Sequence, residues 1–126
     1  MSSDEELIER NILKLAGDGR RILEGHQTST TRLGLRHYVL GHALMVHAFG
    51  RFRIFITRLE ATTFECLLPE HAQTEGCESE RALKQKVRRF YPRVRASDWI
   101  TYVRFEIEET DPIPARRRGF GWGRRG

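Results

Sequence analysis

The segment Arg51-Phe-Arg-Ile-Phe-Ile-Thr-Arg-Leu59 decides the fold. Successive side chains of a β-strand point to opposite faces of a sheet, so alternating residue types indicate a strand with one buried face. The predicted buried face contains Phe52, Ile54 and Ile56. The opposite face contains Arg51, Arg53, Phe55 and Thr57. This segment therefore predicts a strand that carries arginines on its outer side.

Two further segments are predicted to join this strand in one sheet. After a connection near residues 60–61, residues 62–68 alternate again and predict the second arm of a hairpin. Residues 99–108 predict a third strand, whose inner residues are Trp99, Thr101, Val103, Phe105 and Ile107. Its outer residues are Ile100, Tyr102, Arg104 and Glu106. The exposed face of this sheet is then expected to present Arg51, Arg53, Tyr102 and Arg104.

The N-terminal third is predicted to begin with a helix. The capping-box pattern that starts at Ser3, followed by an apolar stripe, predicts a helix over residues 4–16. Residues 20–24 are expected to resume helical structure, and residues 27–31 to form a polar connection. Residues 33–49 predict a strand and then a helix, with a return strand between Gly41 and Gly50 as the alternative to that helix.

The segment after the hairpin is predicted to be a loop followed by a helix. Residues 69–78 are expected to form the loop. Ser79 is a typical N-cap residue, and Pro92 should end a helix that runs to Tyr91. We expect this helix to cover the apolar back of the sheet. The fold class is therefore α+β, with a small, mostly antiparallel sheet backed by helices.

Length and composition indicate one domain and a tail. At 126 residues the chain can bury a core of its own, so residues 1–115 are expected to form a single α+β domain. Residues 116–126 are rich in Arg and Gly without periodicity, which predicts a flexible, disordered basic tail.

The charge balance favours an anionic partner. The net charge is +5 and the pI about 9.8. Of 22 basic residues only three are lysine, which leaves 19 arginines. A guanidinium binds phosphate through two hydrogen bonds and stacks on bases, so this bias favours nucleic acid. A GC-rich gene or an overprinted reading frame explains the bias equally well.

The sequence also bears on the location of the protein. The N-terminus lacks the apolar segment of a signal peptide, and nowhere do eighteen apolar residues run together. We therefore expect a soluble protein without membrane contact, in the cytoplasm or also in the nucleus. Two cysteines are too few for a disulfide framework, which fits a reduced, intracellular chain.

Three groups of basic residues are candidate nucleic-acid-binding sites. The exposed sheet face is the first, because arginines beside Tyr102 can contact phosphate and sugar. The second is a stripe on the helix after Ser79, formed by Arg81, Lys84 and Arg88. The third is the start of the tail, formed by Arg116, Arg117 and Arg118. A solvated sheet face, an ordinary charged helix surface and a solubilising or nuclear-import tail are the respective alternatives.

Metal binding and catalysis are not predicted. Cys66, His71 and Cys77 lack the paired spacing of a structural zinc site. The sequence contains no glycine-rich phosphate loop, nucleophile elbow or HExxH motif. We therefore expect no cofactor, no metal and no enzymatic activity.

The basic hairpin, the following helix and the arginine excess resemble the small plant-virus suppressors of RNA silencing of the tombusvirus and aureusvirus type. The resemblance covers residues 50–95 in element order and composition. It implies a viral protein that acts in the host cell as an α/β dimer, holding duplex RNA against a concave sheet. Tryptophans on N-terminal helices of the tombusvirus proteins measure duplex length. Residues 1–50 contain no tryptophan, which implies binding to both short and long duplexes.

Together these features lead to two hypotheses. The first is a non-enzymatic, homodimeric protein that binds double-stranded RNA by shape and phosphate contacts and sequesters small RNAs to suppress silencing. The second is a protein-interaction module whose basic tail docks a partner, with nucleic acid incidental. Within the tail, Gly121-Trp122-Gly123 resembles the Gly-Trp hooks that engage Argonaute.

Overall fold

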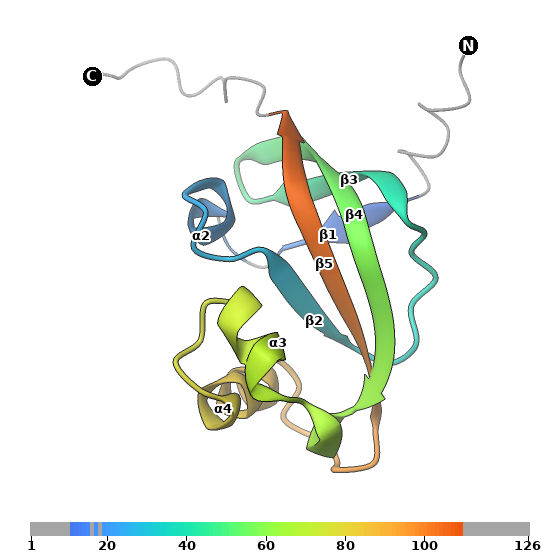
Figure 1. Ribbon diagram of the computed structural model, residues 1–126, viewed down its shortest axis with the longest axis vertical. Helices are drawn as coiled ribbons and strands as arrows, with labels where there is room; N and C mark the ends of the chain where they lie inside the picture. Colours follow the sequence, from blue (N-terminus) through green and yellow to red (C-terminus); the bar gives the residue numbers. More distant parts are fainter. Residues whose placement is uncertain (1–10, 16, 18, 110–126) are drawn as a thin grey trace.

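Five strands form one curled, mixed sheet in the computed structural model, which describes residues 11–15, 17 and 19–109 (Figure 1). In spatial order the strands are β1 (Ile12–Lys14), β3 (Gly41–His47), β4 (Gly50–Thr63), β5 (Trp99–Glu109) and β2 (Ser29–Leu33). β1 runs parallel to β3, whereas the other three pairings are antiparallel. The predicted α+β class is therefore confirmed, and the sheet is mixed.

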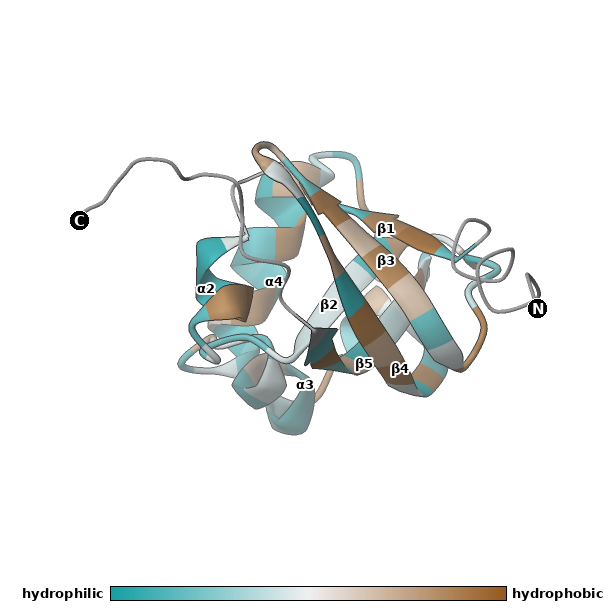
Figure 2. Cartoon of the chain, turned by 90° about the horizontal axis from the view of Figure 1, so that it is seen from above, coloured by the Kyte–Doolittle hydropathy of each residue, from teal (hydrophilic) through white to brown (hydrophobic). Residues whose placement is uncertain are grey.

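The helices are short and gather on one side of the molecule. They are α2 (Arg20–Leu23), α3 (Pro69–Thr74) and α4 (Glu80–Phe90), and a 3-10 turn, η1 (Phe64–Cys66), follows β4. Both views place these helices on one side and the strands β1, β3 and β4 on the other (Figures 1 and 2). No helix among the described residues is long and apolar enough to span a membrane.

The apolar side chains bury themselves in two clusters. The first fills the inside of the curled sheet and contains Leu13, Ile22, Ala43, Met45, Phe52, Ile54, Ile56, Val103 and Phe105. The second lies between the sheet and the pair α3–α4 and contains Phe64, Leu67, Ala72, Leu83, Val87 and Ile100. One end of β5 contacts both clusters. Four successive residues there are therefore buried: Ile100, Thr101, Tyr102 and Val103.

The alternation predicted for β4 is confirmed over residues 51–57. Phe52, Ile54 and Ile56 are buried, whereas Arg51 and Arg53 are exposed. A bulge then follows, since Ile56 pairs with Phe105 but Arg58, not Thr57, pairs with Arg104. A bulge inserts one residue and so changes which side chains share a face. Arg58 consequently lies on the outer face beside Arg104.

The hairpin predicted to turn near residues 60–61 is wrong. β4 continues to Thr63 without turning, and η1 occupies the region predicted as the second arm. β5 covers the predicted third strand and pairs with β4 along its length. The alternation predicted for β5 holds only at its C-terminal half, because Trp99 is exposed and Ile100 buried.

Several other predictions differ from the structure, among them the strand predicted at the start of residues 33–49, of which only Leu33 lies in a strand. Residues 12–14, predicted as the end of a helix, form β1, because they pair with β3. The polar connection at residues 27–31 includes the start of β2, and the predicted loop at 69–78 includes α3. Residues 41–47 form the return strand β3, the alternative to the predicted helix. The remainder of the predicted N-terminal helix, residues 4–10, lies outside the described residues.

The helix predicted after Ser79 is confirmed as α4. The Ser79 hydroxyl accepts a hydrogen bond from the Ala82 N–H at 3.1 Å, which satisfies one of the free donors in the first turn. Leu83 and Val87 are buried against the second cluster, but Phe90 is 55% exposed. α4 therefore packs with α3 at one end of the sheet, and its last turn leaves an aromatic ring at the surface.

Candidate functional site

A cavity of about 280 Å³ lies between the end of β1, α2, β2 and α4. We call it the basic cavity, because the charged residues that line it are Lys14, Arg20, Arg21, Arg32, Lys86 and Glu75. Its uncharged polar lining residues are Gln27, Thr30, Thr31 and Tyr91. Its apolar lining side chains are Leu15, Ile22, Val87 and Phe90. Among the described lining residues, five cations thus face a single carboxylate.

The single carboxylate belongs to Glu75, at the C-terminal end of α3, and its side chain is only 4% exposed. The Thr31 hydroxyl donates to Glu75 Oε1 at 3.0 Å, and Lys86 Nζ lies 3.1 Å from Oε2. Burial raises the pKa of the Glu75 carboxyl, against the opposing effects of Lys86, Thr31 and Arg32. A buried carboxyl with a raised pKa in a cavity is typical of a functional site.

Arg32, which lines the same cavity, has one unsatisfied hydrogen-bond donor. Its Nε donates to the Thr30 hydroxyl at 3.2 Å, and its Nη1 donates to the Lys14 carbonyl at 2.5 Å. These bonds fix the guanidinium plane, while Nη2 is buried and has no hydrogen-bond partner among the described residues. A buried donor without a partner costs about 1–3 kcal/mol, so a ligand oxygen at this position is favoured.

A second hollow, of about 390 Å³, adjoins the basic cavity. Lys14 and Arg32 line both spaces. We call the second space the side hollow, and its other lining residues are Ile12, Arg36, His37 and Tyr38. None of the described residues that line it is acidic.

The structure does not assemble the predicted binding face of the sheet. Arg51, Arg53 and Arg104 are exposed, as predicted. However, Arg51 lies seven residues before Arg58, the partner of Arg104, a separation of roughly 23 Å along a strand. The arginines are therefore spread along the sheet, and Tyr102, predicted to be exposed beside them, is 2% exposed.

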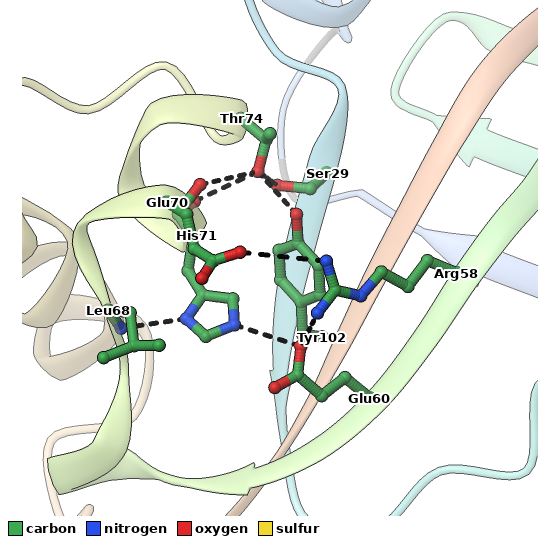
Figure 3. A network of polar contacts seen from close by, with 8 residues as sticks. All are labelled: Ser29, Arg58, Glu60, Leu68, Glu70, His71, Thr74 and Tyr102. Carbon is green, nitrogen blue, oxygen red and sulfur yellow. Dashed lines mark hydrogen bonds and ion pairs between the residues drawn. The ribbon is translucent and has the colours of Figure 1, made fainter.

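Tyr102 is buried because α3 covers it (Figure 3). Its hydroxyl lies 2.7 Å from the Thr74 hydroxyl, and its ring packs edge-on against the His71 imidazole at 4.6 Å. His71 Nδ1 accepts from the Leu68 N–H at 2.8 Å, so its proton is on Nε2, which faces Glu60 at 3.2 Å. This network fixes α3 on the sheet and keeps the Tyr102 ring buried, so that ring cannot stack on a ligand.

The hollow beside this network is a weaker candidate for an anion site. It measures about 360 Å³ and contains Arg58 and Arg104. Arg58 is already paired with Glu60 at 3.0 Å and with Glu70 at 3.8 Å. The local positive charge is therefore partly neutralised, unlike that of the basic cavity.

The predicted stripe on α4 is mostly engaged in contacts within the protein. Lys84 pairs with Glu80 at 2.8 Å and donates to the Glu65 carbonyl at 3.2 Å. The Arg88 guanidinium lies over the Phe64 ring at 4.9 Å, while Arg81 is exposed. Arg116, Arg117, Arg118 and Trp122 of the predicted tail site lie outside the described residues.

The candidate metal ligands are separate from the basic cavity. Within the described ranges, no three His, Cys, Asp or Glu side chains lie together in a way that could hold a metal ion. Cys66 is exposed and Cys77 half-buried, and both are free thiols. Burial raises the pKa of the Cys77 thiol.

Sequence reasoning missed the residues of the basic cavity. Lys14, Arg32, Glu75 and Lys86 come from four different segments of the chain, and no spacing in the sequence brings them together. One signal was present: Lys14 and Lys86 are two of only three lysines in an arginine-rich chain. It does not by itself indicate a common site.

At least two solved structures share this fold. One is an ASCH domain from Lactobacillus crispatus JV V101, with a TM-score of 0.61 and 15% identity, covering 85% of this chain and 94% of that one. The other is a DUF984 protein from Enterococcus faecalis V583, with a TM-score of 0.53 and 14% identity, covering 84% and 89%. No family model matches the chain, and no curated protein matches it significantly.

These similarities overturn the resemblance to plant-virus suppressors. The fold is that of bacterial ASCH and DUF984 structures, so the predicted viral origin, the role in silencing suppression and the host–virus interaction are wrong. The misleading features were an arginine excess and an apparent hairpin. The hairpin does not exist, because β4 runs on to Thr63.

Proposed function

We propose that this domain binds single-stranded RNA without catalysis and holds one nucleotide unit in the basic cavity. The observation that carries the proposal is a cavity where five cations face one carboxylate, and where the lining residue Arg32 has a buried Nη2 without a hydrogen-bond partner among the described residues. A phosphate oxygen would satisfy that donor through a charge-assisted hydrogen bond. Phe90 and Tyr91 line the same cavity, and such rings can stack on a base.

The basic cavity favours a single strand over a duplex. Its volume of about 280 Å³ suits one small ligand unit, and an unpaired nucleotide can enter it whereas a stacked base pair is too large. The duplex preference expected from the sequence relied on a flat basic face with Tyr102 exposed, and Tyr102 lies beneath α3. Strand preference is therefore a direct test of the proposal.

Binding should depend on salt and on Lys14. If about three phosphates are neutralised, affinity for a fluorescein-labelled ten-nucleotide RNA should fall roughly 20-fold between 50 and 200 mM salt. Lys14→Gln should weaken binding several-fold at low salt, because the exposed side chain of Lys14 lines the basic cavity. Fluorescence anisotropy measures both effects.

Lys84→Gln is the matched control, because it removes the same charge from a residue outside the basic cavity. The proposed site is wrong if Lys84→Gln and Lys14→Gln weaken binding equally. A duplex that competes as well as the single strand would contradict the strand preference.

Hydrolysis of a bound nucleotide derivative is a second candidate function. It is favoured by the buried Glu75 carboxylate, which lies within hydrogen-bond distance of both Thr31 and Lys86. A carboxyl with a raised pKa can act as a general base toward water. Glu75→Gln should then abolish turnover and retain RNA binding. Absence of turnover in the unaltered protein would leave binding as the sole proposal.

A further inference from the structure

We infer that the ligand is a strand of several nucleotides, because the side hollow provides a subsite for a phosphate and base next to the unit in the basic cavity. This inference rests on the proposed function and extends it. The two spaces share Lys14 and Arg32, so these two cations lie at the boundary that a strand would cross from one space to the other. A free mononucleotide would use only the first space.

The lining of the side hollow suits a second phosphate. Arg36 adds a third cation to Lys14 and Arg32, and no described carboxylate lines this space. Only Nε of the Arg36 side chain has a hydrogen-bond partner among the described residues, the Leu33 carbonyl at 2.8 Å. Its two terminal nitrogens therefore remain available to form a bidentate contact with phosphate.

The backbone that carries Arg36 is held in place before a ligand arrives. The Thr101 hydroxyl accepts from the Arg36 N–H at 2.9 Å and donates to the Gly34 carbonyl at 2.7 Å. Gly34 N–H donates to the Trp99 carbonyl at 2.7 Å, and Gly34 has a φ of 88°, which favours glycine. A preorganised turn reduces the entropy lost on binding.

The side hollow also offers groups that can contact a base or sugar. The Tyr38 ring is half-buried and packs against the first apolar cluster, so its orientation is restrained. His37 is exposed beside it and carries ring nitrogens that can form hydrogen bonds. A cationic wall next to a restrained aromatic ring is the arrangement that binds single-stranded nucleic acid with little sequence preference.

The test compares uridine 5′-monophosphate with the trinucleotide UpUpU by isothermal titration calorimetry at 50 mM salt. We expect the trinucleotide to bind at least 10-fold tighter. Arg36→Gln should reduce that ratio to about twofold, whereas Arg93→Gln, which removes an exposed arginine charge just after α4, should leave the ratio unchanged.

Each result decides between the two proposals. Equal binding of the two ligands overturns the side-hollow subsite and leaves the proposed function standing. A tighter trinucleotide whose advantage survives Arg36→Gln also overturns it, since the strand then leaves the cavity by another route. If neither ligand binds, the proposed function fails and the subsite fails with it.

Discussion

Glu75 shows how a single residue connects folding to the candidate site. Its carboxyl is almost fully buried, yet it contacts Lys86 and Thr31 in the basic cavity. Burial of a charge is costly unless it is paired, and here desolvation is the largest effect on its pKa. The contacts with Lys86 and Thr31 therefore offset only part of the cost of burying this carboxylate.

The raised pKa of Glu75 predicts a specific dependence of stability on pH. The folded state keeps the Glu75 proton to a higher pH than the unfolded state, whose glutamate titrates at about pH 4.3. The contribution of this group to stability is therefore full below about pH 4.3 and is lost as pH rises through the folded pKa. In denaturant titrations from pH 4 to 8, the unfolding free energy of Glu75→Gln should increase relative to that of the unaltered protein as pH rises. Parallel curves would mean that Glu75 has the same pKa in both states.

Replacing Gly76 by alanine should cause a steric clash, and its cost can be separated from the cost of backbone strain by comparison with Gly25. Gly76 and Gly25 have φ values of 79° and 83°, so alanine is strained at either position. At Gly76 a Cβ would also lie 2.5 Å from the His26 carbonyl oxygen and would contact Arg21, whereas at Gly25 it would enter open space. We expect Gly76→Ala to lower the unfolding free energy by at least about 1 kcal/mol more than Gly25→Ala. Equal losses, measured by urea denaturation, would exclude the steric contribution.

At the scale of elements, the long central strands could be predicted from the sequence and the short edge elements could not. Alternation over residues 51–57 identified the start of β4, because one of its faces is buried along that length. β1 has three residues, too few to show a period, and its Ile12 also fits a helical stripe. The bulge at Thr57 and the cover of α3 over Tyr102 depend on partners remote in sequence.

The candidate site was less predictable than the fold, for a related physical reason. Lys14 and Thr31 lie on the two edge strands, which the curl of the sheet brings to one cavity, and packing of α4 adds Lys86. Neither hydrophobic periodicity nor charge patterning encodes this arrangement. One local signal in the sequence did indicate a missed element, the helix α3, and that signal is Pro69. Proline is common at the first position of a helix, and it stands at the first position of α3.

The Ser79 hydroxyl, at the N-cap of α4, should contribute measurably to the stability of the protein. Ser79→Ala removes the hydrogen bond to the Ala82 N–H and should lower the unfolding free energy by about 1 kcal/mol, or the melting temperature by roughly 4 °C. Ser97→Ala is the control, because Ser97 is exposed and makes no hydrogen bond with a described residue. Circular dichroism melts measure the difference, and equal melting temperatures for the two variants would refute a capping role for Ser79.

At the scale of the molecule, the fold places a positive cavity at the junction of the sheet and its helices. Charges that are dispersed in sequence are concentrated in two adjoining spaces that share Lys14 and Arg32. The sequence predicts a homodimer and a cytoplasmic or nuclear location. Both stay predictions, because the structure of a single chain tests neither of them. The basic tail, residues 116–126, likewise stays a prediction.

Replacing Asn11 should lower both the stability of the protein and its affinity for RNA. Its buried amide donates to the carbonyls of Val39 and His42 at 2.8 and 3.1 Å and accepts from the Val39 N–H at 3.1 Å. Asn11→Ala should lower the unfolding free energy by about 3 kcal/mol, at about 1 kcal/mol for each hydrogen bond lost. It should also weaken RNA binding, because β1 carries Lys14. Gln85→Ala, on the exposed surface of α4, is the control for both measurements. An Asn11→Ala protein with unaltered stability would contradict this role.

The short length of β1 and its place at the sheet edge have a consequence for how occupancy of the basic cavity can be detected. A three-residue strand at the edge of a sheet opens more readily than the core, and its backbone bonds to β3, such as that from the Leu15 N–H to the Val46 carbonyl, should report that opening. A ligand held by Lys14 binds only the closed form and must slow amide exchange there by reciprocity. Deuterium uptake at the edge strand β1 should therefore report whether a ligand occupies the basic cavity.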